Sequence, residues 1–327
     1  MTATYVLLEV ENLNIEFRIG SEYVSAVRDL AVELRPGETL GLAGESGCGK
    51  STAALGIMNL LPDNGRIRSG RIIFDGQDLT KLSSHEIRRV WWKEMAIVFQ
   101  GALNSLNPVK RVGTQIAESL ILRGGLDKKA AWRRVGELFE LIGIKPERVY
   151  DYPHEFSGGM RQRAMIAMAI CLNPKLVIAD ECTTALDVMI QTQIMNLLKA
   201  LKVQLQLSMI FINHDLALIA EICDRVAIMY AGRIVEIGEM EDLFFRPAHP
   251  YVKLLLQSLP RLKGPAEDLV SIPGAPPRLK DVPMGCSFLP RCPIGADDCS
   301  RSIPHLTEVE KDHRAACFKI EKTKGNK

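Results

Sequence analysis

One glycine-rich segment in this chain has the residue types and spacing that phosphate chemistry needs. It is Gly44-Glu45-Ser46-Gly47-Cys48-Gly49-Lys50-Ser51, which fits the pattern G-x-x-x-x-G-K-[S/T]. Its glycines let backbone N–H groups turn toward a β-phosphate, and Lys50 supplies a point charge for the β- and γ-phosphate oxygens. The Ser51 hydroxyl suits a Mg²⁺ ligand, and Thr52 begins a helix-like stretch at the same site. The segment predicts a binding site for a nucleoside triphosphate with Mg²⁺; a chance glycine-rich turn is the alternative.

Two adjacent acids end the apolar run Leu176-Val177-Ile178-Ala179-Asp180-Glu181. A β-branched run of this kind is typical of a strand buried on both faces, which delivers the acids at its C-terminal edge. Because side chains alternate along a strand, Asp180 and Glu181 cannot have the same role. Asp180 suits holding Mg²⁺ through water, and Glu181 suits polarising the water that attacks a γ-phosphate. The alternative for Glu181 is a solvated strand end.

A second glycine-rich segment, Phe156-Ser157-Gly158-Gly159-Met160-Arg161-Gln162-Arg163, opens a helix-like stretch that runs to about residue 172. The free N–H groups and dipole of such a helix start form an anion site. Because one loop already holds a triphosphate, we expect Ser157, Gly158 and Gly159 to close over the γ-phosphate of a nucleotide bound to a second, facing subunit. An ordinary helix with Ser157 as its N-cap is the alternative.

The segments around these motifs predict the elements that position them. A short apolar strand over residues 39–43 precedes the phosphate loop, and a helix over residues 52–60 follows it. The remaining pattern is read as an antiparallel sheet, a strand with a turn, a helical arm, and an alternation of strands and helices typical of a largely parallel α/β core. These predictions cover residues 7–34, 71–76, 112–142 and 175–230, respectively.

The composition predicts no membrane-spanning segment in this chain. The 327 residues carry a formal charge of only +2, so no affinity for nucleic acid is implied. Hydrophobic residues make up 47% of the chain, yet no apolar run approaches the roughly 18 residues that cross a bilayer. The N-terminus lacks the charged and apolar regions of a signal peptide. We expect a cytoplasmic protein that does any membrane work through partners.

Over nearly its whole length the chain resembles the ATP-binding subunits of ABC transporters, in which two domains sandwich two ATP molecules head to tail. The resemblance implies an α/β fold, with an ABC-type P-loop ATPase core, an antiparallel β subdomain, and a helical subdomain over about residues 101–172 that rotates on ATP binding. It also implies further roles. Gln100 matches a glutamine that senses Mg²⁺ and water, His214 matches the switch histidine at the γ-phosphate, and Asp187 matches the loop that communicates across the dimer.

The adenine contact and two departures from the family pattern complete this comparison. Tyr23 is the expected stacking partner of adenine, with Phe17 as the alternative, because stacking requires only a flat π-face. Cys182 stands where the family nearly always has proline, and Gly101-Ala102 replaces the acid–proline pair usual after the glutamine. Neither departure removes a catalytic group, so we expect hydrolysis to survive; contact with the membrane partner is where they matter.

Beyond about residue 247 prolines become frequent, and four of the eight cysteines gather near the end of the chain: Cys286, Cys292, Cys299 and Cys317. Their spacing lacks the C-x2-C pairs common in structural zinc sites, whereas four thiolates suit an iron–sulfur cluster. Zinc, or unmetallated thiols packed as small hydrophobes, are the alternatives.

This tail resembles that of the oligopeptide and dipeptide permease branch of the family, in which a stretch like Cys286-Ser287-Phe288-Leu289-Pro290-Arg291-Cys292-Pro293 is typical and a 4Fe-4S cluster is known in some members. We therefore expect an ATPase domain over residues 1–250 and a small, irregular, cysteine-rich region over residues 251–327.

The branch also implies partners and a location. These are a second ABC ATPase subunit, often a paralogue in a heterodimer, two transmembrane permease subunits and an extracytoplasmic solute-binding protein, with the ATPase held at the cytoplasmic face of the membrane. The implied function is ATP-driven import of peptides; import of nickel chelates or oligosaccharides is the alternative.

Other classes fit less well. An ABC ATPase of DNA repair carries its metal cysteines inside the ATPase rather than at the tail, and a chromosome-structure ATPase needs far more residues between the two glycine-rich segments. An exporter ATPase would lack this tail, and a regulatory module would be expected to have lost Lys50, Glu181 or His214.

Overall fold

The computed structural model describes residues 5–101, 105–184, 186–258 and 271–320. By their internal contacts the residues form two compact units. The first unit comprises residues 1–9, 33–39 and 73–213, and the second comprises residues 10–32, 40–72 and 214–327. Each unit has its own part of the nucleotide motifs.

In the first unit three parallel strands carry the acid pair and Gln100 at their C-terminal ends. β7 (Leu176–Asp180) pairs with β6 (Met95–Val98) on one side and with β8 (Ser208–Ile212) on the other. Every residue of β7 and β8 is buried. The predicted strand buried on both faces is therefore confirmed, and its apolar composition follows from having no solvent-facing side.

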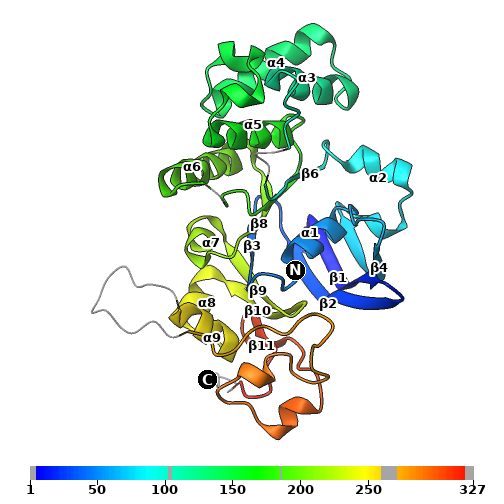
Figure 1. Cartoon of the computed structure of the whole chain (residues 1–327), viewed down its shortest axis with the longest axis vertical. Coiled ribbons are helices and arrows are strands. Elements are labelled where there is room, and N and C mark those ends of the chain that lie inside the picture. The colour runs from blue at the N-terminus through cyan, green and yellow to red at the C-terminus, as the bar shows by residue number, and fades with distance from the viewer. Residues whose placement is uncertain (1–4, 102–104, 185, 259–270, 321–327) are drawn as a thin grey trace. The chain divides into compact units, whose positions relative to one another are not determined.

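The helical arm of the first unit is built from α3 (Val112–Leu122), α4 (Lys128–Leu141) and α5 (Gly158–Ile170), which lie together in Figure 1. Asp127 begins α4 by accepting a hydrogen bond from the Ala130 N–H. Other elements of this unit are β5 (Gln77–Asp78), α2 (Ser84–Val90), α6 (Val188–Leu205) and the short 3₁₀ helices Leu79–Lys81, Pro146–Tyr150 and Pro153–Glu155.

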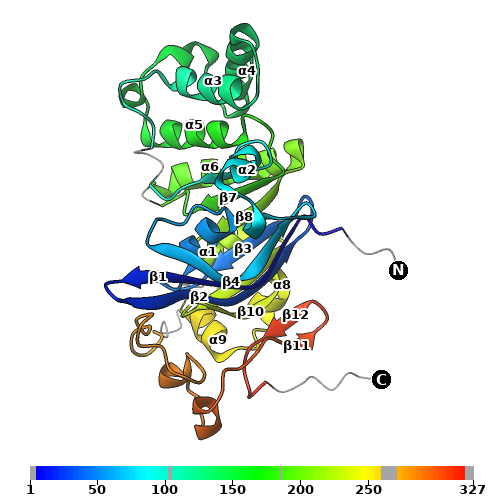
Figure 2. The same ribbon diagram turned by 90° about the vertical axis from the view of Figure 1, so that its right-hand side faces the viewer.

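In the second unit β1 (Leu8–Ile19) lies between β2 (Glu22–Leu34) and β4 (Gly65–Phe74), as Figure 2 shows. The first residues of β1 and the last residues of β2 and β4 are assigned to the first unit. Helix α1 (Lys50–Ile57) packs close to β1, because a Cβ placed on Gly56 would lie 2.3 Å from the Ile15 side chain. The sequence predicted this helix a few residues late, over residues 52–60.

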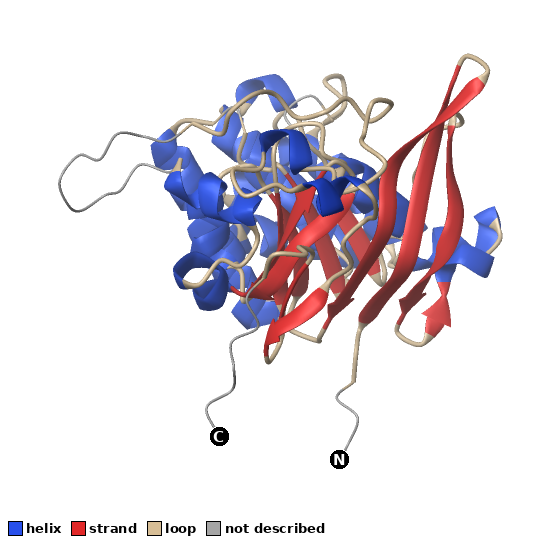
Figure 3. Ribbon diagram, turned by 90° about the horizontal axis from the view of Figure 1, so that it is seen from below, coloured by secondary structure: helices blue, strands red, loops and turns tan. Residues whose placement is uncertain are grey.

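The second unit also contains a mixed sheet. β3 (Thr39–Ala43) runs parallel to β9 (Arg225–Tyr230), with Leu40 opposite Arg225, and β10 (Arg233–Glu239) is antiparallel to β9. The helices of this unit are α7 (Leu216–Ile222), α8 (Met240–Phe245) and α9 (Pro250–Gln257); helices are blue and strands red in Figure 3.

The described part of the tail is more ordered than its proline content predicts. Short 3₁₀ helices at Leu289–Arg291 and Asp297–Ser300 are followed by the strands β11 (Thr307–Glu310) and β12 (His313–Ala315), and β12 pairs with β10. The buried side chains of His313 and Glu236, 1% and 0% exposed, make a hydrogen-bond contact of 2.7 Å across this pairing. The tail is therefore part of the sheet of the second unit and is not an independent appendage.

Within the described ranges, no helix combines the length and the apolar character needed to cross a membrane.

Candidate functional site

The phosphate loop lies between β3 and α1, as the sequence predicted, and its glycines adopt conformations open to few other residues. Gly44, Gly47 and Gly49 have φ angles of 146°, 77° and 109°. A Cβ at Gly44 would lie 2.2 Å from the Met229 carbonyl oxygen, and one at Gly49 would lie 2.6 Å from that of Ala26. The loop is thus held close to neighbouring backbone, which side chains at these two positions would prevent.

Lys50 is directed into this loop. Its side chain is buried, and Nζ donates hydrogen bonds to the carbonyl oxygens of Gly44 (2.8 Å) and Glu45 (3.1 Å). Gly49 begins α1 without a side-chain cap, and Ser51 and Thr52 occupy the first turn. An ammonium group beside a helix N-terminus is the arrangement that binds nucleotide phosphates.

Two cysteines within the motifs are inert. Burial raises the pKa of the Cys48 thiol, despite the nearby Lys50, and raises the pKa of Cys182 to about 12. Neither thiol ionises near neutral pH, so Cys182, in the position where the family has proline, acts as a small packing group.

The acid pair at the end of β7 differs in environment, as its alternation along the strand predicted. Asp180 is 4% exposed, whereas Glu181 is partly exposed and has the left-handed φ of 45°. Its N–H donates to the Ile212 carbonyl oxygen (3.0 Å), and Gln100 Nε2 donates to Glu181 Oε2 (2.6 Å). The structure therefore brings Glu181 and Gln100 together, although 81 positions separate them.

The second glycine-rich segment begins α5. The Ser157 hydroxyl accepts a hydrogen bond from the Met160 N–H (3.4 Å), so Ser157 is an N-cap as well as a candidate phosphate ligand. Gly159 is buried, and a Cβ there would lie 2.8 Å from Ile190 Cγ2 of α6. Asp187 is the N-cap of α6 and accepts from the Ile190 N–H (2.9 Å). Gly159 thus allows the starts of two helices to approach closely.

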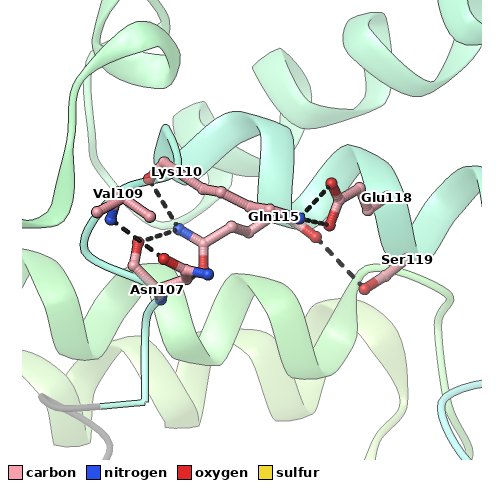
Figure 4. Close-up of polar contacts among 6 residues, drawn as sticks. All are labelled: Asn107, Val109, Lys110, Gln115, Glu118 and Ser119. Carbon is pink, nitrogen blue, oxygen red and sulfur yellow. Dashed lines mark hydrogen bonds and ion pairs between the residues drawn. The ribbon is translucent and has the colours of Figure 1, made fainter.

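The turn over residues 107–110 is anchored to α3, as Figure 4 shows. The Gln115 side chain accepts from the Asn107 N–H (2.8 Å) and donates to the carbonyl oxygens of Asn107 and Lys110. Lys110 pairs with Glu118 at 2.8 Å, while Val109 is 80% exposed. The result is a fixed turn with an exposed apolar tip. Ala102 lies outside the described residues, so only Gly101 of the predicted departure is placed.

The remaining nucleotide assignments stay predictions. His214 is exposed and directly follows the buried Asn213. Tyr23 is 46% exposed, with the Arg66 guanidinium 3.8 Å from its ring centroid, so Arg66 covers one of its faces. Phe17 is partly buried against Gly65. Ala185, two residues before Asp187, lies outside the described residues.

The four tail cysteines lie around one cavity, which Cys286, Cys292, Cys299 and Cys317 line together with Phe288 and His249. Burial raises the pKa of the Cys286, Cys292 and Cys317 thiols. In the part of the chain that the structure describes, no three His, Cys, Asp or Glu side chains are close enough together to hold one metal ion. The expected gathering of the thiols is observed, while a metal centre is not established.

Arg291, which lies between two of these cysteines, is part of the tail motif, but the motif gave it no role. Its guanidinium contacts the Glu45 carboxylate of the phosphate loop at 2.7 and 3.0 Å. No spacing rule relates two residues 246 positions apart, so only the folded chain could identify this pair.

Comparison with known proteins agrees with this arrangement. Residues 27–184 match the family model "ABC transporter", and residues 235–299 match "Oligopeptide/dipeptide transporter, C-terminal region". The chain belongs to the ABC transporter family, as an ATP-hydrolysing subunit with a C-terminal region of the oligopeptide/dipeptide type.

Among its relatives is the oligopeptide transport ATP-binding protein OppD of Escherichia coli, 46% identical over 96% of this chain and 93% of the relative. OppD of Bacillus subtilis is 50% identical over 94% of this chain and 87% of its own length. The dipeptide transport ATP-binding protein DppD of B. subtilis is 44% identical over 95% and 94%, respectively.

Solved structures support the fold. A dimeric, post-hydrolysis state of the ATP-binding cassette MJ0796 bound to ADP and Pi has a TM-score of 0.64 and 25% identity, and covers 71% of this chain and 98% of its own. The cbiO1 protein of Clostridium perfringens, part of the transporter complex cbiONQ, has a TM-score of 0.65 and 28% identity, with 74% and 91% covered.

Proposed function

We propose that this chain hydrolyses ATP to drive the import of peptides through an ABC transporter. The observation that carries the proposal is the pairing of Gln100 with Glu181 at the end of a buried strand, in a chain that also has a complete phosphate loop. Relatives named for oligopeptide and dipeptide transport match almost the full length of the chain and support peptides as the cargo.

In the proposed mechanism Lys50 and the loop N–H groups bind the β- and γ-phosphates. Ser51, Gln100 and Asp180 are the residues that would hold Mg²⁺. The Mg²⁺ ion supplies charge neutralisation for phosphoryl transfer. Glu181 accepts a proton from the attacking water, and its contact with Gln100 fixes the carboxylate that does so. His214 contacts the γ-phosphate, and Tyr23 stacks on adenine, with Phe17 as the alternative.

The second half of each site comes from a facing ATPase subunit in this proposal. Ser157, Gly158 and Gly159 cover the γ-phosphate bound to the partner, and Asp187 lies in the contact between subunits. The dimeric state of the related cassette MJ0796 supports a two-subunit arrangement. The facing subunit is proposed to be a paralogue, and two permeases and an extracytoplasmic binding protein complete the transporter at the cytoplasmic face of the membrane.

The tail cysteines are proposed to hold a 4Fe-4S cluster. Four thiols lining one cavity fit the donor set of such a cluster. Iron, zinc and sulfide assays on protein purified without oxygen, with a visible spectrum, test this. Protein that contains neither iron nor sulfide contradicts the cluster.

The transport function is tested in proteoliposomes that hold the chain with its permeases, binding protein and partner ATPase. We expect a mixed peptide pool to stimulate ATP hydrolysis and to accumulate inside the vesicles, and Lys50→Ala to abolish both. Stimulation by nickel chelates or oligosaccharides in place of peptides would contradict the cargo. Hydrolysis equal to that of Lys50→Ala would contradict the function itself.

A further inference from the structure

The C-terminal extension (residues 271–320) reaches the phosphate loop through Arg291. Arg291 Nη1 and Nη2 donate to the two carboxylate oxygens of Glu45 at 2.7 and 3.0 Å, the two-pronged geometry that makes arginine–carboxylate pairs strong. The Arg291 side chain is 5% exposed and that of Glu45 is 24% exposed. A pair this sheltered from solvent constrains both partners, unlike an ordinary surface ion pair.

Arg291 is itself held rigidly. Its Nε donates to the Pro273 carbonyl oxygen (2.8 Å), and Nη1 also lies 3.3 Å from the Tyr230 hydroxyl. The turn that carries it is closed by backbone hydrogen bonds from Leu289 to Cys286 and from Arg291 to Phe288, each 3.0 Å. The guanidinium is therefore a fixed group whose position depends on the fold of the extension.

Aromatic packing joins the same turn to the loop. The Phe288 ring packs against Tyr230 and Tyr251, with centroids 5.2 and 5.3 Å apart. The Tyr251 hydroxyl accepts a hydrogen bond from the Glu45 N–H (3.1 Å). Two groups outside the loop thus hold Glu45, one at its side chain and one at its backbone.

Glu45 is the residue through which these contacts reach the phosphate-binding group. Its carbonyl oxygen accepts a hydrogen bond from Lys50 Nζ (3.1 Å). If the Glu45 side chain lost Arg291, its carboxylate would become an unpaired negative charge within the loop that binds a polyanion. Repulsion between that carboxylate and the triphosphate would weaken binding.

We propose that Arg291 is a positioning residue for the phosphate loop, which fixes Glu45 and neutralises its charge, so that the C-terminal extension sets the affinity for ATP. The inference rests on the proposed ATP binding at Lys50. It assigns to the extension a role in nucleotide affinity that is separate from any metal in the cysteine cavity.

The test compares Arg291→Ala, Arg291→Lys and the double variant Arg291→Ala/Glu45→Gln with the parent chain. Arg301→Ala is the matched control, because Arg301 is an exposed arginine of the same extension. For each full-length protein the Kd for MgATP is measured by titration, and KM and kcat are measured in the assembled transporter. Chemical unfolding is followed in parallel.

We expect Arg291→Ala to raise the Kd and the KM for ATP about tenfold, with kcat changed less than twofold, which corresponds to about 1.4 kcal/mol of lost binding. Removing the unpaired carboxylate in the double variant restores most of the affinity, although the Arg291 contact is still missing. Arg291→Lys keeps the charge but loses the two-pronged geometry, so its Kd rises about threefold. Arg301→Ala binds as the parent does.

Three results would overturn the proposal. These are parent affinity in Arg291→Ala, a double variant no better than Arg291→Ala, and, should Arg291→Ala fail to fold, parent affinity in a folded Arg291→Lys. A merely structural role predicts that the double variant is the weakest of all, because it lacks both partners. A parent chain with no saturable MgATP binding would instead sink the proposed function, and this inference with it.

Discussion

Glu45 and Glu181 both follow a buried parallel strand, but the contacts that hold them come from different parts of the chain. Glu181 is held by Gln100 and by the Ile212 carbonyl, both at the ends of the strands beside its own. Glu45 is held by Tyr251 and Arg291, which are 206 and 246 positions away. The Glu181 carboxylate is therefore held within the core sheet of its unit, whereas Glu45 is held by α9 and by the C-terminal extension.

The first prediction tests the part of the comparison that concerns Glu181. We expect Glu181→Gln to lower ATP hydrolysis by about 10²- to 10⁴-fold, because the amide cannot accept a proton from water. The Kd for MgATP should stay close to that of the parent, since the phosphate loop is unaffected. Phosphate release and nucleotide titration measure the two quantities. Glu140→Gln, at an exposed position of α4, is the control. Hydrolysis at the parental rate would remove Glu181 from the mechanism.

The second prediction concerns Glu236 of β10, which contacts both the start of α9 and β12 of the extension. Glu236 accepts hydrogen bonds from the N–H groups of Ala248 (2.8 Å) and His249 (2.7 Å) and contacts His313 Nε2 (2.7 Å). In Glu236→Gln, one of these groups would face an amide NH₂ instead of an oxygen. We expect a loss of about 3 kcal/mol in the free energy of unfolding.

Chemical denaturation of this variant is compared with that of Glu308→Gln, at an exposed position of β11. A weakened anchor should also raise the Kd for MgATP, because Tyr251 and Arg291 are part of the same unit. An unchanged unfolding free energy would mean that the buried contact contributes nothing net.

The third prediction concerns the tight contact at the second glycine-rich segment, in the unit of Glu181. We expect Gly159→Ala to cost about 1–3 kcal/mol in unfolding free energy, because its Cβ would lie 2.8 Å from Ile190. Gly158→Ala is the matched control, since the nearest atom to a Cβ there is 3.7 Å away. In an Ile190→Ala background, the further cost of Gly159→Ala in unfolding free energy should be smaller than in the parent, because the clashing side chain is gone. Equal unfolding curves for the two glycine variants would contradict the packing argument.

The sequence predicted the site at its local level and missed what connects distant parts. The strand–loop–helix at Lys50 and the buried strand before Glu181 were predictable, because glycine spacing and apolar runs are local signals. The pairing of β12 with β10 and the contact of Arg291 with Glu45 were not, because the tail contains many prolines and no local pattern specifies a partner. The extension was expected to be irregular, and its described part includes two strands of a sheet.

The last prediction uses pH to probe the residue that begins the helix carrying Tyr251. His249 Nδ1 accepts a hydrogen bond from the Tyr251 N–H (3.1 Å), and burial, with a smaller effect from Lys253, lowers the pKa of His249 to about 3. Below pH 6.5 the unfolded chain binds a proton at His249, whereas the folded chain does so only near pH 3. The free energy of unfolding is therefore unaffected by this group above pH 6.5 and falls as the pH drops from 6.5 toward 3.

Between pH 6.5 and pH 5 we expect the parent to lose about 2 kcal/mol through this group. His249→Asn keeps an acceptor for the Tyr251 N–H but does not titrate, so the stability difference between variant and parent should change by that amount over the same range. Urea denaturation at pH 7, 6 and 5 measures it. A constant difference would mean that the folded chain also binds a proton at His249. A neutral histidine would then not be needed to hold the start of the helix that carries Tyr251.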